Sequence, residues 1–266
     1  MSFMASTGSA KVTASSHCNE TPAWRQTRVC SYGLRRAMYQ IVATCCALLL
    51  GAMNPHVAAA ETPIHVVALG DSLTAGYGLP ASDGFVPRLQ AALAAQGAQG
   101  GVQGRAQGGA QVVNVEIANA GVSGDTASDG LARLDWSVPE GTDAVIVELG
   151  ANDMLRGIDP QITRDALDAI LARLAQRHIA VMLCGMRAAP NLGDDYGRAF
   201  ERIYPELAAK YGAVFYPFFL DGAAANRTLT QQDGLHPNAA GVGAIVGRIL
   251  PTVQELIARV RAQKQS

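Results

Sequence analysis

The chain has 266 residues, of which 49% are hydrophobic and 16% charged, and its formal net charge is −1. The apolar fraction is high enough to build a core, which excludes wholesale disorder, and the near-neutral balance excludes a strongly basic nucleic-acid-binding protein. Aromatic residues make up 6% of the chain and only one stretch is a candidate membrane span, so a multi-span membrane protein is excluded too.

The first 60 residues differ in composition from the rest. They hold five basic side chains and one acidic one, whereas residues 61–266 hold 16 basic and 21 acidic side chains. Arg35 and Arg36 precede a short apolar run at 41–53, and small residues follow up to Ala60. This pattern is typical of a secretory signal peptide. We therefore expect residues 1–60 to be a signal peptide with an N-terminal extension, cleaved near Ala60, and residues 61–266 to be one exported domain without stable membrane insertion.

The first half of that domain alternates between strand and helix patterns. Residues 64–69 form a short apolar run rich in valine that ends at Gly70, which is typical of a buried strand. Residues 86–95 have helical spacing, and residues 97–111 are rich in Gly and Gln, which predicts a flexible surface insertion. The elements predicted next are a strand at 112–118 and a helix at 126–134.

The same alternation continues in the second half of the domain. The predicted strands are 144–149, 180–184 and 213–216, and the predicted helices are 160–177, 200–211 and 239–262. Cys184 is the one cysteine after residue 60, and its apolar neighbours predict a buried strand residue rather than a reactive thiol. Short apolar strands between helices predict an α/β fold with a parallel sheet of about five strands, covered on both faces.

Polar, glycine-containing segments follow the first three predicted strands, and a fourth lies near the C-terminus. They are Gly70-Asp71-Ser72-Leu73-Thr74, the run from Asn119 to Asp125, Gly150-Ala151-Asn152-Asp153, and Asp233-Gly234-Leu235-His236-Pro237. In parallel α/β sheets, active groups gather in the loops at the carboxyl ends of the strands. We therefore expect these four segments to meet at one edge of the sheet.

Together these segments contain the parts of a nucleophilic hydrolase. Ser72 is the candidate nucleophile, which needs a base to remove its proton, and His236 is the candidate base. Asp233, three residues earlier, can hold the other imidazole nitrogen. The amides of Ser72 and Gly124 and the side chain of Asn152 are candidate donors to an oxyanion. Each residue alone has a structural interpretation, as a helix cap, a turn glycine or a structural histidine, and only the combination favours catalysis.

These residues resemble the SGNH, or GDSL, hydrolase superfamily, whose motifs supply Ser, Gly, Asn and His. The matching segments are GDSLTAGYG with Ser72, NAGVSGDT with Gly124, ELGANDMLRG with Asn152 and DGLHP with Asp233 and His236. Further segments, including the run from Gly130 to Leu134, resemble the bacterial periplasmic group of acyl-CoA thioesterase I, lysophospholipase and arylesterase. The resemblance covers roughly residues 63–255, and the departures are the 97–111 insertion and the long N-terminus.

The resemblance implies a flavodoxin-like three-layer α/β/α sandwich and a secreted or periplasmic enzyme of Gram-negative type. It implies acyl transfer to Ser72 followed by hydrolysis, with no metal or cofactor, on a small-molecule acyl ester or thioester. Neither nucleic acid nor a second copy is expected as a partner, so a monomer is predicted. Four residues on loops near the motifs are candidates for lining an acyl pocket: Met154, Leu155, Ile158 and Met186.

Two other functions remain open. A carbohydrate O-acetylesterase could use the same catalytic residues with a small acyl pocket, and comparing acetyl with long-chain esters would distinguish it. A non-catalytic binding module on the same sheet is disfavoured by the complete set of candidate residues. Gly76–Ala81 formally fits a dinucleotide-binding pattern, but it lies several residues beyond the strand and lacks the acidic partner. Because the base must be neutral, activity should fall in acid.

Overall fold

The computed structural model describes residues 62–103 and 114–265. Its centre is a five-stranded sheet in which every pair of neighbouring strands is parallel. The strands are β1 (Ile64–Gly70), β2 (Val115–Gly121), β3 (Ala144–Glu148), β4 (Ala180–Cys184) and β5 (Val214–Tyr216). The predicted signal peptide at 1–60 lies outside the described residues.

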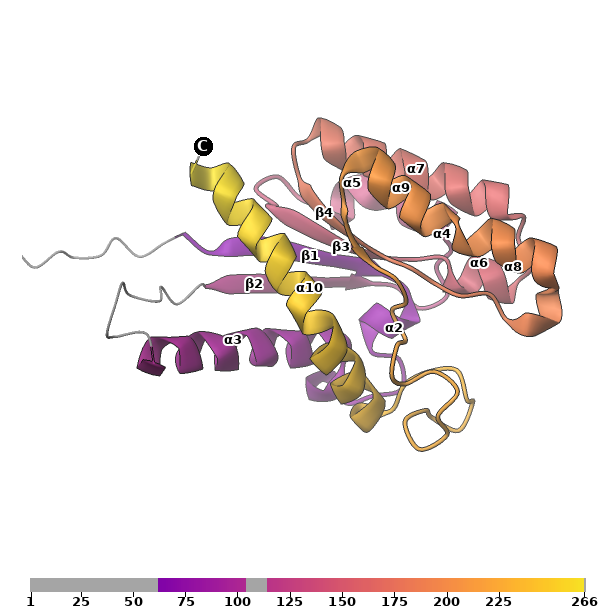
Figure 1. Ribbon diagram of the computed structural model, residues 1–266, viewed down its shortest axis with the longest axis horizontal. Helices are drawn as coiled ribbons and strands as arrows, with labels where there is room; N and C mark the ends of the chain where they lie inside the picture. Colours follow the sequence, from indigo (N-terminus) through magenta and orange to yellow (C-terminus); the bar gives the residue numbers. More distant parts are fainter. Residues whose placement is uncertain (1–61, 104–113, 266) are drawn as a thin grey trace, which may run out of the picture. The chain divides into compact units, whose positions relative to one another are not determined.

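The strand order is β2-β1-β3-β4-β5, the doubly wound order of flavodoxin-like folds. Figure 1 shows α3 (Phe85–Gln103) and α10 (Ala239–Gln265) on one side of the sheet, and α7 (Pro160–Gln176) among the helices on the other side. The three layers confirm the predicted α/β/α sandwich with five parallel strands. The reversal of strand order between β1 and β3 places a topological switch point there, where such sheets bind ligands.

Shorter helices complete the two outer layers and the loops. They are α2 (Ser72–Ala75), α4 (Ala127–Ala132), α5 (Leu134–Ser137), α6 (Ala151–Leu155), α8 (Asp194–Glu201) and α9 (Ile203–Tyr211), with 3₁₀ turns at Ala81–Asp83 and Pro190–Leu192. Two of these short helices, α2 and α6, begin two and three residues after the ends of β1 and β3, respectively. Their first turns therefore lie at the carboxyl edge of the sheet.

Four predicted elements differ from the structure. The helix predicted at 200–211 is two helices, α8 (Asp194–Glu201) and α9 (Ile203–Tyr211), separated at Arg202. The strand predicted at 112–118 runs from Val115 to Gly121, because its full length pairs with β1 from Ile64 to Gly70. The helix predicted to end at Ala95 continues to Gln103, so the first part of the 97–111 segment is helical. Alanine and glutamine favour helix and offset the cost of the glycines there, about 1 kcal/mol each.

The helix predicted at 126–134 is also interrupted. It divides into α4 and α5 at Arg133, whose backbone leaves the helical region with φ −103° and ψ 6°. Thr126 caps the start of α4 through a reciprocal pair of bonds with Asp129. The helix is thus interrupted at the residue whose side chain donates to the carbonyl of Gly70, at the end of β1.

The sheet and the inner faces of the helices form one core. Its largest fully buried side chains include Tyr204, Phe85, Phe200 and Phe219, and Cys184 is fully buried as predicted. Within the described residues, α10 is the one helix long and apolar enough to cross a membrane, with a mean hydropathy of 1.2 over its best window. Half of that window is buried inside the protein, and this degree of burial is typical of a core helix.

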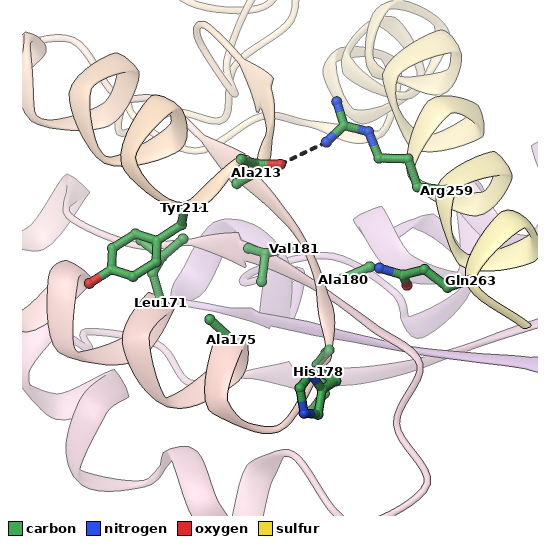
Figure 2. A pocket seen from close by; sticks show the side chains of 11 residues that line it. Leu171, Ala175, His178, Ala180, Val181, Tyr211, Ala213, Arg259 and Gln263 are labelled. Carbon is green, nitrogen blue, oxygen red and sulfur yellow. Dashed lines mark hydrogen bonds between the residues drawn. The ribbon is translucent and has the colours of Figure 1, made fainter. Parts of the chain in front are cut away.

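A cavity of about 250 Å³ lies at the amino edge of the sheet, where β4 begins (Figure 2). It lies between the end of α7, the end of α9 and the last turns of α10. Arg259 donates to the carbonyl of Gly212 at 2.7 Å, which satisfies a free carbonyl at the end of α9. This cavity is at the edge of the sheet opposite to the four motif segments, and its arginine has a structural partner.

Candidate active site

The four polar segments meet at the carboxyl edge of the sheet. Ser72 is the first residue of α2, directly beyond β1, and only 9% of its surface is exposed. Asp71 caps this helix by accepting a hydrogen bond from the Leu73 amide at 3.0 Å. The cap turns the chain sharply after the strand, which places the Ser72 hydroxyl at the rim.

The side chains of Ser72, His236 and Asp233 lie in one hydrogen-bonded chain. The Ser72 Oγ atom lies 2.9 Å from Nε2 of His236, and Nδ1 of His236 lies 2.6 Å from Oδ2 of Asp233. With the proton on Nδ1, the imidazole donates to Asp233 and accepts from the serine hydroxyl. The hydrogen bond from His236 is the main cause that lowers the pKa of Asp233 to about 2. Asp233 therefore stays ionised at any pH near neutrality.

The turn that presents His236 is held by its own polar groups. The second carboxylate oxygen of Asp233 accepts from the backbone amides of Leu235 at 2.9 Å and His236 at 3.1 Å. Gln231 donates to the carbonyls of Tyr77 at 2.7 Å and Pro237 at 3.1 Å, which joins this turn to the loop after α2. The Tyr77 ring lies against the imidazole with centroids 4.7 Å apart. The imidazole orientation is thus restrained on both sides.

Two backbone amides are placed as candidate oxyanion donors. Gly124 has φ +91°, a conformation that favours glycine, and it lies in the turn that follows β2. The carbonyl oxygen of Gly124 accepts a hydrogen bond from Nη2 of Arg156 at 2.7 Å. This bond restrains the peptide group between Gly124 and Asp125. Within the described residues, the amides of Ser72 and Gly124 have no hydrogen-bond acceptor, which leaves both available to a substrate.

The side chain of Asn152 is engaged differently from the expectation. Its Nδ2 atom donates to Oδ2 of Asp71 at 3.0 Å and to the carbonyl of Asp125 at 2.9 Å. Both amide hydrogens are therefore directed at internal acceptors. This arrangement fixes Asn152 between the loops after β1 and β2, and donation to an oxyanion requires one of these hydrogens to be shared.

Two buried carboxyl groups lie beneath the serine. Asp71 is fully buried, and burial is the main cause that raises its pKa to about 6. Glu148, at the end of β3, is also fully buried and accepts from the Thr74 hydroxyl at 2.7 Å. Burial, with the nearby Asp71 charge as a second cause, raises the pKa of Glu148 well above its usual value. The two carboxyl groups beneath Ser72 are therefore in surroundings that disfavour their ionised form.

A second cavity lies beside the His236 turn. It has a volume of about 280 Å³ and is lined mainly by small and apolar residues: Ala189, Leu220, Ala223, Ala224, Ala225, Thr230, Gly234, Leu235 and Pro237. Gly234, Leu235 and Pro237 belong to the same turn as the histidine. The cavity thus borders the turn that carries His236, although neither Ser72 nor His236 lines it.

The four residues predicted to line an acyl pocket do not line this cavity. Met186 is only 3% exposed and belongs to the hydrophobic core, Met154 packs partly against that core, and Leu155 is 52% exposed. Ile158 is half-buried, and its carbonyl accepts from the hydroxyl of Tyr196 at 2.9 Å. Nearness to a motif in sequence does not determine which way a side chain points.

Several residues of the site were missed by the sequence analysis. Asp71 lies in the segment GDSLTAGYG and Glu148 in the segment ELGANDMLRG. The sequence shows that both residues are close to the motif residues, but it does not show that they are buried. Tyr77 lies in the same first segment, and its contact with His236 spans a separation that no local pattern encodes. Within the described residues there is no group of three or more His, Cys, Asp or Glu side chains placed to hold a metal ion.

Comparison with known proteins identifies the family. Residues 68–244 match the model of the GDSL-like lipase/acylhydrolase family. The chain is 34% identical over 218 residues to an esterase, TesA, of Pseudomonas aeruginosa, covering 82% of this chain and 98% of that protein. It is 34% identical over 211 residues to thioesterase 1/protease 1/lysophospholipase L1 of Escherichia coli, covering 79% of this chain and 91% of the other.

Solved structures agree with this assignment. The esterase AlinE4, an SGNH-hydrolase family member, is 40% identical with a TM-score of 0.58, covering 74% of this chain and 98% of that one. The chain belongs to the GDSL-like lipase/acylhydrolase family. It is an ester or thioester hydrolase, as its relatives named esterase and thioesterase are.

The buried Glu148 leads to a prediction about stability and pH. Because its pKa is higher in the folded protein than in the unfolded chain, its contribution to stability decreases as the pH rises above the unfolded value. Glu148→Gln removes the ionisation, so the melting temperature of the variant relative to the parent should rise between pH 5 and pH 8. Each kcal/mol corresponds to roughly 2–4 °C for a domain of this size.

Thermal unfolding followed by circular dichroism at pH 5 and pH 8 measures this difference. Glu140→Gln is the matched control, because Glu140 is exposed. The melting temperature of this variant should equal that of the parent at both pH 5 and pH 8. An equal displacement of Glu148→Gln at pH 5 and pH 8 would contradict the prediction.

Proposed function

We propose that the protein cleaves acyl esters and thioesters through an acyl-enzyme on Ser72, with His236 as general base and Asp233 orienting it. The observation that supports this most directly is the unbroken chain from Ser72 Oγ to His236 Nε2, 2.9 Å, and from His236 Nδ1 to Asp233 Oδ2, 2.6 Å. These distances are within hydrogen-bond reach for a nucleophile and its base.

The reaction follows from this geometry. As the Ser72 oxygen bonds to the acyl carbon, its proton passes to Nε2 of His236, and the carbonyl oxygen becomes an anion facing the amides of Ser72 and Gly124. Collapse breaks the bond to the leaving oxygen or sulfur, which takes the proton from the imidazolium. Water then attacks the acyl-enzyme and gives one proton to His236. Collapse breaks the bond to the Ser72 oxygen, which takes that proton back from the imidazolium, and the acid is released. Asn152 supplies the third donor when one of its amide hydrogens is shared with the oxyanion.

The acyl chain is proposed to enter the cavity beside the His236 turn. Its lining of alanine, leucine and proline side chains offers apolar surface without charge over a volume of about 280 Å³. An apolar lining without charged groups suits a hydrocarbon chain better than a polar sugar or head group. The favoured substrates are therefore medium- or long-chain acyl esters and thioesters. The alternative function is that of a carbohydrate O-acetylesterase, whose substrates carry acetyl groups.

Substitution of the nucleophile is the primary test. Ser72→Ala should lower kcat/KM for p-nitrophenyl butyrate by about four orders of magnitude or more, because the acyl-enzyme cannot form. Ser128→Ala is the matched control, since Ser128 is an exposed serine on α4 and its variant should keep parental activity. Full activity in Ser72→Ala would rule out the mechanism, and an inactive parent would favour the binding module.

Filling the cavity tests the substrate class. Ala189→Phe should lower kcat/KM for p-nitrophenyl decanoate by about tenfold, in line with a loss of 1–3 kcal/mol of apolar contact, and leave the acetate ester unchanged. Rates on a series from acetyl to palmitoyl esters measure this, with Ala189→Ser as a control of similar size. Equal losses on acetate and decanoate would contradict the assigned pocket, and a parent that prefers acetate would favour the O-acetylesterase.

Export is proposed from the sequence pattern of residues 35–60, with positive, apolar and small-residue regions in that order. Expression of the full chain in a Gram-negative host should yield a periplasmic form that begins at Glu61, as determined by fractionation and intact mass. Replacing Arg35 and Arg36 by Asp should retain the chain in the cytoplasm. A parental chain found uncleaved in the cytoplasm would overturn this proposal.

A further inference from the structure

Arg133 is a buried arginine behind the proposed oxyanion hole. Its side chain is only 8% exposed, and it extends from the junction of α4 and α5 toward the carboxyl edge of the sheet. Its Nη2 donates to the carbonyl of Gly70 at 2.8 Å, and its Nη1 donates to the carbonyl of Ala120 at 2.8 Å. One guanidinium therefore connects the ends of β1 and β2, the two strands that lead to Ser72 and Gly124.

The same guanidinium holds the loop after β2. Its Nε donates to Oδ2 of Asp125 at 2.5 Å, and the Asp125 side chain is only 13% exposed. Asp125 follows Gly124 directly, and its carbonyl accepts from Nδ2 of Asn152 at 2.9 Å. Asp125 is therefore bound on one side by Arg133 and on the other side by Asn152.

All three proposed oxyanion donors lie next to a group that Arg133 holds. The Ser72 amide is two residues beyond the Gly70 carbonyl, the Gly124 amide precedes Asp125, and the Asn152 amide is bound to the Asp125 carbonyl. We propose that Arg133 is a positioning residue that sets the separation of the three oxyanion donors by joining Gly70, Ala120 and Asp125. This inference rests on the function proposed for Ser72, Gly124 and Asn152.

The geometry explains why an arginine stands at this position. A planar guanidinium offers five N–H groups in a fixed arrangement, and four contacts are made here to Asp125, Ala120, Gly70 and the Ser137 hydroxyl. A lysine ammonium is a single point charge with three donors. It can keep the ion pair with Asp125 but cannot reach both strand ends, so the spacing of the donors would change while the charge stays.

The main experiment is Arg133→Lys in the full domain. We expect kcat for p-nitrophenyl butyrate to fall about 10- to 100-fold with KM within about twofold, because displacement of catalytic groups by about 1 Å costs up to 100-fold in rate. The inhibition constant of a trifluoromethyl ketone, which forms an oxyanion on Ser72, should weaken by the same factor. Titration with a p-nitrophenyl phosphonate measures the concentration of competent sites, so each rate is expressed per site.

Arg177→Lys is the matched control. Arg177 also donates to two backbone carbonyls, those of Val138 at 2.7 Å and Pro139 at 3.0 Å, but these precede β3 at the amino edge of the sheet. Its variant should keep kcat per site and the affinity for the ketone. A second variant, Asp125→Asn, should lower kcat in the same way, and its effect should not add to that of Arg133→Lys, because both break one linkage.

The outcomes separate this inference from the proposed function. A fall in kcat per site and in ketone affinity, with KM preserved and Arg177→Lys unaffected, supports the positioning role. Loss of competent sites with parental kcat per site, or an unchanged ketone affinity, overturns it and leaves Arg133 as a structural residue. If Ser72→Ala retains activity, the proposed function fails instead, whatever Arg133→Lys shows.

Discussion

The amide nitrogen of Asn152 lies within 3.0 Å of both Asp71 and Asp125, and this pair of hydrogen bonds joins the loops that follow three different strands. Such a junction requires the carboxyl ends of β1, β2 and β3 to lie side by side, which the parallel order β2-β1-β3 provides. Because loop backbone is otherwise free to move, polar links between loops are needed to give the site one geometry. The rest of the site is arranged around this junction.

The junction is stabilised by groups that are costly to bury. Asp71, Glu148 and Arg133 are each less than 10% exposed, and burial of an unpaired charge is strongly unfavourable. Arg133 is compensated by Asp125 and by backbone carbonyls, and Asp71 by the Leu73 amide and Asn152. Glu148 is compensated less completely, since its Oε1 atom has no partner among the described residues. Buried polar networks of this kind favour a unique arrangement over maximum stability.

His236 and Asp233, in the outer part of the site, are held by interactions other than burial. The side chains of His236 and Asp233 are 20% and 36% exposed, so this pair lies at the rim and remains in contact with solvent. Local bonds within the turn, the Tyr77 ring and the Gln231 link to the loop after α2 hold the imidazole in place without full burial. Ser72 therefore lies on buried polar groups, whereas His236 is held at the surface by its own turn and by one neighbouring loop.

Much of the fold was predictable because its signals are local. Short apolar runs between helical patterns predicted the strands, and the spacing of apolar residues predicted the long helices. The errors arise where strand pairing or a tertiary contact sets the ends of an element. β2 begins and ends three residues later than predicted because it pairs with all of β1. Likewise, Arg133 interrupts a predicted continuous helix where its side chain turns toward the strand ends.

For the site, the sequence by itself determined the residue types and their order: Ser72, Gly124, Asn152, Asp233 and His236, each in a polar segment at a strand end or in a tight turn. Only the tertiary structure decided which side chains face one another. It directed the Asn152 amide toward Asp71 and Asp125, buried Met186 in the core and opened a cavity beside the His236 turn instead. The physical reason is that motif spacing records chain connectivity, whereas the direction and burial of a side chain depend on elements packed from distant parts of the chain.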